Sequence, residues 1–381
     1  MGNLCETNET QKMTSVQMPS KQQQAETMGQ SSEMNLHFSS QQEQARKKLS
    51  VDDFEMLNQL GKGAFGKVYK VKKKDNNKIY ALKAMNKKQI FDSNLEQNAV
   101  IEKEVLNNSK HPFIVHLKYS FQSKTKLYFV MEYIDGGEFY QILQRTQGLP
   151  EPVVQFVAAE VILALEYLNM KLKIIYRDLK PENLLLTKSG HVKLTDFGLA
   201  TKRKESNIKS YTLVGTTEYL APEIIRKDGH SFEVDLWTLG ILIYEMIAGK
   251  TPFSHPERNQ MKIQYLILKN NPVYPPTMSR DAKDLINSLL QTNPQLRLGA
   301  NGYDSIKNHS YFSKINWQDL YELKVKSPLK TFAEENSNRL QNLKPLQTQI
   351  KETPVGTPIP QLIDVSFSGN EMERNSSYKN Y

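Results

Sequence analysis

The chain has 381 residues and a single cysteine, and its 50 Lys and Arg outnumber 41 Asp and Glu to give a formal net charge of +9 at pH 7. This length exceeds the roughly 100 to 200 residues of one domain, so two lobes, or a core with tails, are expected. Cys5 alone excludes an intramolecular disulfide and a cysteine-based zinc finger, which favours a reducing, cytoplasmic location, with the nucleus or the membrane periphery as alternatives.

The chain begins and ends with polar segments. Residues 1–53 are rich in Gln and Ser, with Phe38 as their only aromatic residue, so they bury too little apolar surface to offset the entropy of ordering. A disordered tail is predicted there, and residues 313–381 are expected to form a partly disordered extension. No apolar run approaches the roughly 18 residues of a membrane span, and the N-terminus lacks the apolar core of a signal peptide.

The front of the remaining chain has the pattern of strands. Apolar and polar residues alternate at 67–71, 79–85 and 127–131, which predicts three strands, and a helical pattern covers 95–107 between them. We therefore expect a small, strand-rich lobe with one main helix.

The back of the chain has the pattern of helices. From Gly137 onward, the apolar spacing at 153–170 and 232–248 is typical of long helices. The sequence thus predicts an α+β fold, with a strand-rich lobe at 54–131, a larger helical lobe at 135–312 and a small-molecule site in the cleft between them.

Three glycines in the spacing G-x-G-x-x-G, Gly61, Gly63 and Gly66, lie in the strand-rich lobe. Such a loop lets backbone N–H groups approach phosphate oxygens, although an ordinary hairpin or a dinucleotide-binding turn uses the same spacing. A dinucleotide fold needs a helix after the third glycine, whereas residues 67–71 alternate as a strand does. The order strand, glycine loop, strand favours a triphosphate site.

Lys83 lies on the strand at 79–85, with Ala81 expected on the same, cleft-facing side. An inward lysine needs an anion, and Glu102 from the helix at 95–107 can orient it toward the α- and β-phosphates of a nucleotide. The alternative is that both residues are solvated surface charges, as single Lys and Glu residues usually are.

Two further motifs carry the chemistry of phosphoryl transfer. Tyr176-Arg-Asp-Leu-Lys-Pro-Glu-Asn183 and Thr195-Asp-Phe-Gly198 contain two Asp, one Lys and one Asn in the order and spacing that this reaction uses. With them, residues 54–312 resemble a eukaryotic protein kinase. Ala221-Pro-Glu223 and the residues 235–240 fit the same resemblance, as does Arg297, which the family pairs with Glu223 in a buried bridge.

Three features are similar to the AGC group of kinases: Tyr176, the run 215–223 and the residues 315–320. The resemblance implies a bilobal kinase fold, a C-terminal extension of AGC type at 313–381, and ATP and Mg²⁺ as cofactors. Asp178 would be the catalytic base, Lys180 would neutralise the transferring phosphoryl group, and Asn183 and Asp196 would bind Mg²⁺. The implied nucleotide-binding residues are Leu60, Gly61, Gly63, Gly66, Val68, Ala81, Lys83, Met131, Glu132, Ile134, Glu138 and Leu185.

The resemblance also implies the acceptor and the substrate class. Lys180 and Thr216 are similar to serine/threonine rather than tyrosine kinases. Glu138, Glu182 and Glu245 stand where AGC kinases that prefer basic substrates bind arginines before the acceptor, so protein substrates with basic flanks are expected. The alternative is that these three are ordinary solvated glutamates.

Regulation is expected at Thr212, which lies between the Asp196 motif and Ala221-Pro-Glu223 and whose phosphate Arg177 would hold. Position 201 is Thr where some relatives place a phosphate-binding Lys, and position 98 is Asn where some place His. No further regulatory module accompanies the core, so control by a separate subunit or an upstream activating kinase is expected.

The tails carry further candidate sites. Gly2 and Cys5 suit myristate and palmitate, although Glu6 departs from the acylation consensus, so a membrane partner is expected only if the N-terminus is acylated. Thr353-Pro354 and Thr357-Pro358 resemble turn-motif sites. Phe367-Ser368 resembles the end of a hydrophobic motif whose first aromatic residue is replaced by Asp364.

Two other functions compete with an active kinase. A pseudokinase scaffold would have lost Lys83, Asp178, Asn183 or Asp196, and all four are present. Nucleic-acid binding is suggested only by the net charge and by the lysines in 70–78, which lack interleaved aromatic residues for stacking bases. We therefore expect no nucleic-acid partner.

Overall fold

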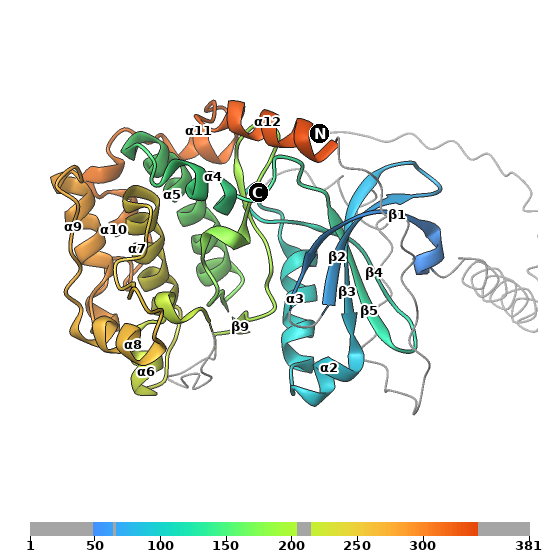
Figure 1. Cartoon of the computed structure of the whole chain (residues 1–381), viewed down its shortest axis with the longest axis horizontal. Coiled ribbons are helices and arrows are strands. Elements are labelled where there is room, and N and C mark those ends of the chain that lie inside the picture. Colours follow the sequence, from blue (N-terminus) through green and yellow to red (C-terminus); the bar gives the residue numbers. More distant parts are fainter. Residues whose placement is uncertain (1–48, 64–65, 204–214, 342–381) are drawn as a thin grey trace, which may run out of the picture. The chain divides into compact units, whose positions relative to one another are not determined.

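The computed structural model describes residues 49–63, 66–203 and 215–341. By its internal contacts the chain divides into residues 1–49 and a second unit at 50–381, and all the helices and strands described lie in the second unit. In Figure 1, the sheet with α3 forms one lobe and the helices from α4 onward form the other. The predicted α+β fold with two lobes is confirmed.

The N-lobe is built on a five-stranded antiparallel sheet with the strand order β1-β2-β3-β5-β4. The predicted strands at 67–71, 79–85 and 127–131 lie within β2, β3 and β5. The strands are β1 (Phe54–Lys62), β2 (Gly66–Lys73), β3 (Ile79–Asn86), β4 (Leu117–Gln122) and β5 (Lys126–Glu132). A 3₁₀ turn, η1 (Val51–Asp53), precedes them.

The glycine loop joins β1 to β2, and Gly63 N donates to Gly66 O across it at 2.9 Å. A Cβ at position 66 would lie 2.0 Å from the backbone oxygen of Ala84 on β3, so only glycine lets the two strands approach this closely. Residues 64–65 at the tip lie outside the described ranges.

Two helices, α2 (Lys87–Asp92) and α3 (Glu96–Asn108), follow β3. Asn86 begins α2 as its N-cap, with its side chain accepting a hydrogen bond from Lys88 N. The helix predicted at 95–107 agrees with α3 to within a residue. Its buried face includes Glu102 among apolar residues, which brings a carboxylate to the inner side of the lobe.

The C-lobe is mainly helical, and α5 and α7 correspond to the helices predicted at 153–170 and 232–248. Its helices are α4 (Tyr140–Thr146), α5 (Glu151–Glu166), α6 (Pro222–Arg226), α7 (Glu233–Ala248), α8 (Gln260–Lys269), α9 (Arg280–Leu289) and α10 (Asp304–Lys307). Single turns add η2 (Tyr167–Lys171), η3 (Pro181–Asn183), η4 (Thr217–Tyr219), η5 (Pro294–Leu296) and η6 (Ser310–Phe312).

Two short antiparallel strand pairs accompany these helices. The first is a hairpin of β7 (Leu184–Leu186) and β8 (Val192–Leu194), and the second pairs β6 (Ile174–Ile175) with β9 (Thr201–Lys202). The residues between β6 and β7 and between β8 and β9 are those of the two phosphoryl-transfer motifs. The two strand pairs therefore fix the ends of both motif loops.

The sequence predicted that no segment is long and apolar enough for a membrane span, but one helix in the structure is. Residues Glu151–Lys171, which are α5 and its π-helical continuation η2, pass that test by length and composition. However, 72% of the most apolar window is buried inside the C-lobe, and Val154, Val157 and Val161 are fully buried. A helix that is apolar on every side is typical of a core helix, so this one is weak evidence for a membrane.

Two helices, α11 (Trp317–Tyr321) and α12 (Lys330–Gln341), follow the C-lobe. Ser327 Oγ donates to Gly190 O at 2.6 Å, which anchors the segment before α12 to the β7–β8 turn. Gly190 has a φ of +85°, and a Cβ there would lie 2.6 Å from Lys330 N. Arg145 of α4 donates to Asn336 Oδ1 of α12 at 3.3 Å, so α12 lies against α4.

Candidate active site

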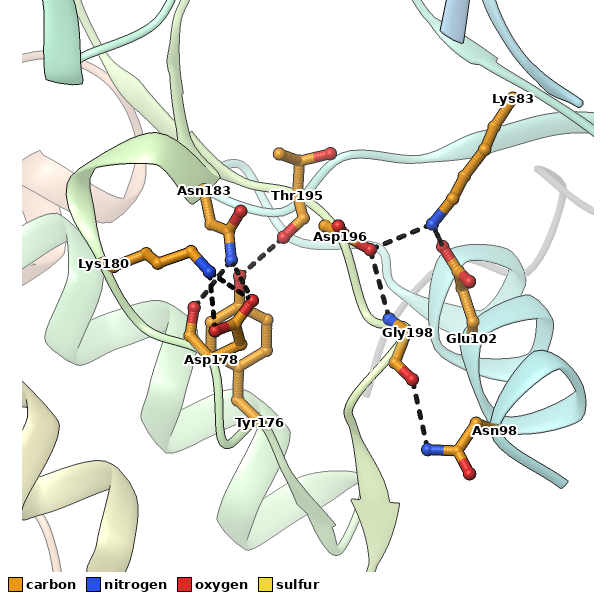
Figure 2. Close-up of polar contacts among 10 residues, drawn as sticks. All are labelled: Lys83, Asn98, Glu102, Tyr176, Asp178, Lys180, Asn183, Thr195, Asp196 and Gly198. Atoms are coloured by element: carbon orange, nitrogen blue, oxygen red, sulfur yellow. Dashed lines mark hydrogen bonds and ion pairs between the residues drawn. The ribbon is translucent and has the colours of Figure 1, made fainter. Parts of the chain in front are cut away.

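Lys83, Glu102 and Asp196 meet between the two lobes (Figure 2). Lys83 Nζ on β3 lies 2.6 Å from Glu102 Oε1 on α3 and 2.9 Å from Asp196 Oδ1 in the loop after β8. The Glu102 side chain is 3% exposed and that of Asp196 is 50% exposed. One buried carboxylate and one accessible carboxylate thus hold the lysine.

Lys83 and Asp196 each stabilise the charged form of the other. Burial lowers the pKa of Lys83, but the attraction of Asp196 and Glu102 outweighs burial, and the net shift is upward. The Lys83 ammonium in turn lowers the pKa of Asp196, more strongly than burial raises it. Lys83 and Asp196 are therefore both ionised at neutral pH, as phosphate and metal binding require.

Asp178 lies at the centre of the second group, in the loop between β6 and η3. Lys180 Nζ lies 2.9 Å from both carboxylate oxygens, and Asn183 Nδ2 donates to the backbone oxygen and to Oδ2 of Asp178 at 2.7 Å. Lys180 Nζ also donates to Thr216 Oγ1 at 3.2 Å. Burial raises the pKa of Asp178, and the Lys180 charge opposes that shift.

Asp235 on α7 fixes the loop that carries Asp178. Its carboxylate accepts hydrogen bonds from Tyr176 N at 2.9 Å, from Arg177 N at 2.8 Å and from Asn169 Nδ2 at 2.9 Å. Arg177 has a φ of +67°, a conformation that costs about 1 kcal/mol or more and persists only where neighbouring contacts enforce it. Tyr176 also donates from its hydroxyl to Thr195 O at 2.6 Å, which links the two motifs.

Sequence reasoning assigned no role to Asp235 or Asn169. Asp235 is fully buried within α7, whose residues are otherwise largely apolar. A buried carboxylate is stable only when it is hydrogen-bonded, so an Asp within an apolar helical run was the available signal. Asn169 lies in η2, and its partner Asp235 is far away in the sequence, so no local pattern indicated it.

Asn183 and Asp196 are the predicted metal ligands. The amide nitrogen of Asn183 donates to Asp178, so its amide oxygen points away from Asp178, as Figure 2 shows. The described residues contain no group of three His, Cys, Asp or Glu that could form an all-protein metal site. One amide and one carboxylate oxygen fit Mg²⁺, which keeps several waters and binds substrate phosphates alongside few protein ligands.

The predicted nucleotide-binding residues come together through strand register. Val68 of β2 pairs with Lys83, and Ala81 of β3 pairs with Met131 of β5. An isolated bridge joins Glu138 to Leu185 of β7. These pairings make Val68 a neighbour of Lys83, Ala81 a neighbour of Met131, and Glu138 a neighbour of Leu185.

The remaining predicted contacts lie on β1 and in the lobe-connecting segment. Gly61 pairs with Val68, and Leu60 and Ile134 are half-buried. The Glu132 side chain accepts hydrogen bonds from Lys193 Nζ at 2.7 Å and from His116 N at 3.0 Å. Its carboxylate is thus engaged elsewhere, and its backbone N–H donates to His116 O at 3.1 Å.

The three predicted substrate-binding glutamates influence one another electrostatically. Burial raises the pKa of Glu245 to about 7 and also raises that of Glu138, and the Glu182 charge contributes to both shifts. Glu245 Oε2 accepts a hydrogen bond from the hydroxyl of Tyr219. The Glu182 charge thus links Glu138 and Glu245 electrostatically, and Thr216 is exposed.

Several predicted sites lie outside the described residues: Thr212, the acylation candidates Gly2 and Cys5, and the tail motifs within 353–368. Arg177, the residue expected to hold a phosphate on Thr212, is described. Its Nε donates to Leu199 O at 2.7 Å, and burial lowers its pKa to about 10.

Comparison with known proteins gives consistent matches. A family model described as protein kinase domain matches residues 54–312. A RAC family serine/threonine-protein kinase homolog of Dictyostelium discoideum is 42% identical over 285 residues, which cover 74% of this chain and 62% of that protein. Serine/threonine-protein kinase AtPK1/AtPK6 of Arabidopsis thaliana is 44% identical over 295 residues, covering 76% of this chain and 61% of its own.

A third relative is serine/threonine-protein kinase YPK1 of Saccharomyces cerevisiae, which is 46% identical over 274 residues, covering 72% of this chain and 40% of its own length. The matches thus extend over 40% to 62% of these three relatives. The likeness is therefore to their kinase regions.

Proposed function

The chain belongs to the protein kinase family, and we propose that it acts as an AGC-type serine/threonine kinase that transfers the γ-phosphoryl group of Mg·ATP to protein substrates with basic flanks. The family implies ATP, a divalent metal and protein substrates. The observation that carries the proposal is the position of Lys83 Nζ, 2.6 Å from Glu102 and 2.9 Å from Asp196. A lysine held in this way is ready to bind phosphate oxygens.

Each charged residue has a task in this reaction. Lys83 binds the α- and β-phosphate oxygens, and Glu102 keeps its ammonium in place. Asn183 and Asp196 would hold Mg²⁺, which when bound neutralises charge on the phosphate oxygens. Asp178 accepts a hydrogen bond from the substrate hydroxyl and aligns it for in-line attack. Lys180, 2.9 Å from Asp178, places a positive charge where the transferred group passes.

The proposed preference for basic substrates rests on Glu138, Glu182 and Glu245. Burial raises the pKa of both Glu138 and Glu245, and the Glu182 charge adds to each shift, so a bound arginine guanidinium would offset the repulsion from Glu182. Thr216 lies near the acceptor position because its hydroxyl accepts from Lys180. We therefore propose Ser or Thr acceptors that follow arginine by two or three residues.

Regulation by an upstream kinase acting on Thr212 is part of the same proposal. Arg177 immediately precedes Asp178, and its contact with Leu199 O joins this loop to the segment after Asp196. A phosphate bound there would act on both motifs through one side chain.

A positional-scanning peptide assay on the purified chain with Mg·ATP tests the proposal. Peptides with Arg two or three residues before Ser or Thr are expected to be phosphorylated fastest, and tyrosine acceptors not at all. The control is Asp196→Asn, which removes the accessible carboxylate with little change in shape. Equal activity in this variant, or equal use of acidic-flanked peptides, would contradict the assignment.

A further inference from the structure

One turn of α3 closes a ring of polar contacts with the Asp196–Gly198 segment. Asn98 Nδ2 donates to Gly198 O at 3.1 Å, and Gly198 N donates to Asp196 Oδ1 at 3.3 Å. Asp196 Oδ1 lies 2.9 Å from Lys83 Nζ, which lies 2.6 Å from Glu102 Oε1. Asn98 and Glu102 are four residues apart on one face of α3, so this series of contacts begins and ends on the same helix, as Figure 2 shows.

The ring fixes a backbone that is otherwise unfavourable. Asp196 has a φ of +55°, a left-handed conformation that few residues other than glycine adopt. Gly198, two residues later, is hydrogen-bonded at both its N–H and its carbonyl. These two bonds fix the orientation of the peptide units on either side of Gly198. A Cβ at Gly198 would lie 3.2 Å from Asp196 Oδ1, so the segment is tightly fitted to the carboxylate.

A second contact links α3 to the same part of the chain, but it is more exposed. Lys202 Nζ of β9 lies 2.8 Å from Glu104 Oε2, with side chains 54% and 39% exposed. Exposed ion pairs are screened by water and salt and contribute little. Asn98 is half-buried and bonds directly to the segment that carries Asp196, so it is the stronger restraint on that carboxylate.

We propose that Asn98 is a positioning residue, which holds the Asp196 carboxylate toward Lys83 and the metal site by binding the Gly198 carbonyl to α3. This inference rests on the proposed kinase function and adds a determinant of it. All the members of the ring lie between residues 83 and 198, within the described part of the chain.

Two variants test the proposal. Asn98→Ala removes the donor, and Asn98→Asp replaces the donor with an acceptor that repels the Gly198 carbonyl. For Asn98→Ala, the Mg²⁺ concentration giving half-maximal activity is expected to rise about fivefold, which corresponds to the loss of one hydrogen bond, and for Asn98→Asp it is expected to rise further. The KM for the peptide is expected to stay unchanged. Asn98→Gln keeps the amide on a longer side chain and is expected to recover part of the loss.

Hydrogen–deuterium exchange on the ligand-free protein gives a readout that needs no activity. The amide of Gly198 is expected to exchange several-fold faster in Asn98→Ala than in the wild type. The matched control is Gln97→Ala, an exposed neighbour on the same helix, which should change neither exchange nor Mg²⁺ dependence. Lys202→Ala is expected to have a smaller effect than Asn98→Ala.

The outcomes separate this inference from the kinase function. An active wild type with unchanged Mg²⁺ dependence and exchange in Asn98→Ala overturns the role of Asn98 and leaves the function standing. A lower melting temperature with both readouts unchanged also overturns it, because Asn98 is then only a structural residue. A wild type that transfers no phosphate contradicts the function, while the exchange of Gly198 still decides whether Asn98 holds this segment.

Discussion

Arg297 and Glu223 form a buried two-point salt bridge, with Nη1 2.6 Å from Oε1 and Nη2 2.6 Å from Oε2. The side chains are 0% and 3% exposed. Arg297 also donates from Nε to Gln291 O at 2.9 Å and from Nη1 to Glu233 O at 2.8 Å. Glu223 lies in α6 and Arg297 directly follows η5, so the bridge ties the segment that carries Thr216 to this later part of the C-lobe.

Removing one charge of this bridge should be strongly destabilising. Glu223→Gln leaves the Arg297 guanidinium buried without a counter-charge, and we expect the free energy of unfolding to fall by about 3 to 5 kcal/mol. Urea unfolding followed by circular dichroism measures this. The double variant Glu223→Gln, Arg297→Met should recover part of the loss because no buried charge remains. A double variant as unstable as Glu223→Gln alone would contradict the explanation.

This bridge was implied by the resemblance to protein kinases, because Glu223 and Arg297 each stand in a motif that matches that family. The sequence also predicted Lys83, Glu102, Asp178 and Asp196 as one site, since the chemistry of phosphoryl transfer demands those residue types in that order. Bilobal organisation followed from the change between strand and helix periodicity. These features could be predicted because each leaves a signal in side-chain identity or spacing.

Other features left no such signal. Asn98 contacts a backbone carbonyl, and a carbonyl has no sequence signature, so its contact depends on how α3 packs against the Asp196–Gly198 segment. The length and composition of α5 also suit a membrane span. That it is instead buried in the C-lobe depends on neighbours distant in the sequence, which no local pattern shows. The engagement of Glu132 by Lys193 depends on the position of β8. Tertiary packing decides all three.

Gly66 and Gly61 offer a matched pair in the glycine loop. A Cβ at Gly66 would lie 2.0 Å from Ala84 O, whereas one at Gly61 would meet nothing within 4 Å. We expect Gly66→Ala to separate β2 from β3 and to reduce the free energy of unfolding by about 1 to 3 kcal/mol. Gly61→Ala should stay within about 0.5 kcal/mol of the wild type. Equal melting temperatures for the two variants would refute this distinction.

Asp178→Asn tests the assigned base. The amide keeps the shape of the carboxylate but cannot accept the substrate proton, so kcat should fall by about 10²- to 10⁴-fold. In the described part of the chain, Lys83 and Asp196 form no hydrogen bond or ion pair with Asp178. The affinity for Mg·ADP, measured by calorimetry, should therefore remain within about twofold of the wild-type value. A large loss of nucleotide affinity with kcat unchanged would assign Asp178 to binding instead.

His111 gives a prediction for stability in acid. It is 7% exposed, it accepts a hydrogen bond from Phe113 N at Nδ1, and its ring lies 5.0 Å from Tyr167 and 5.3 Å from Tyr321 of α11. Burial, helped by the charge of Lys193, lowers the pKa of His111 to about 4. The unfolded chain therefore binds a proton between about pH 6.5 and 4 that the folded protein does not.

The sign of the effect follows from this difference. Stability should decrease as the pH falls through that window, by on the order of 3 kcal/mol from His111 alone. His111→Phe keeps a ring in place and has no such proton, so its unfolding free energy should depend less on pH between 6.5 and 4. Parallel curves for the variant and the wild type, from urea unfolding at several pH values, would count against His111 as the cause.

Glu245 predicts the pH dependence of substrate recognition. Burial raises its pKa to about 7, so the carboxylate is largely charged at pH 8 and largely neutral at pH 6, whereas substrate arginine stays charged. The kcat/KM for an arginine-containing peptide should therefore fall about tenfold from pH 8 to pH 6. Glu245→Gln should have a low, nearly flat profile, and a peptide without arginine should show little pH dependence with either protein. A wild-type profile that persists in Glu245→Gln would assign the titration to another group.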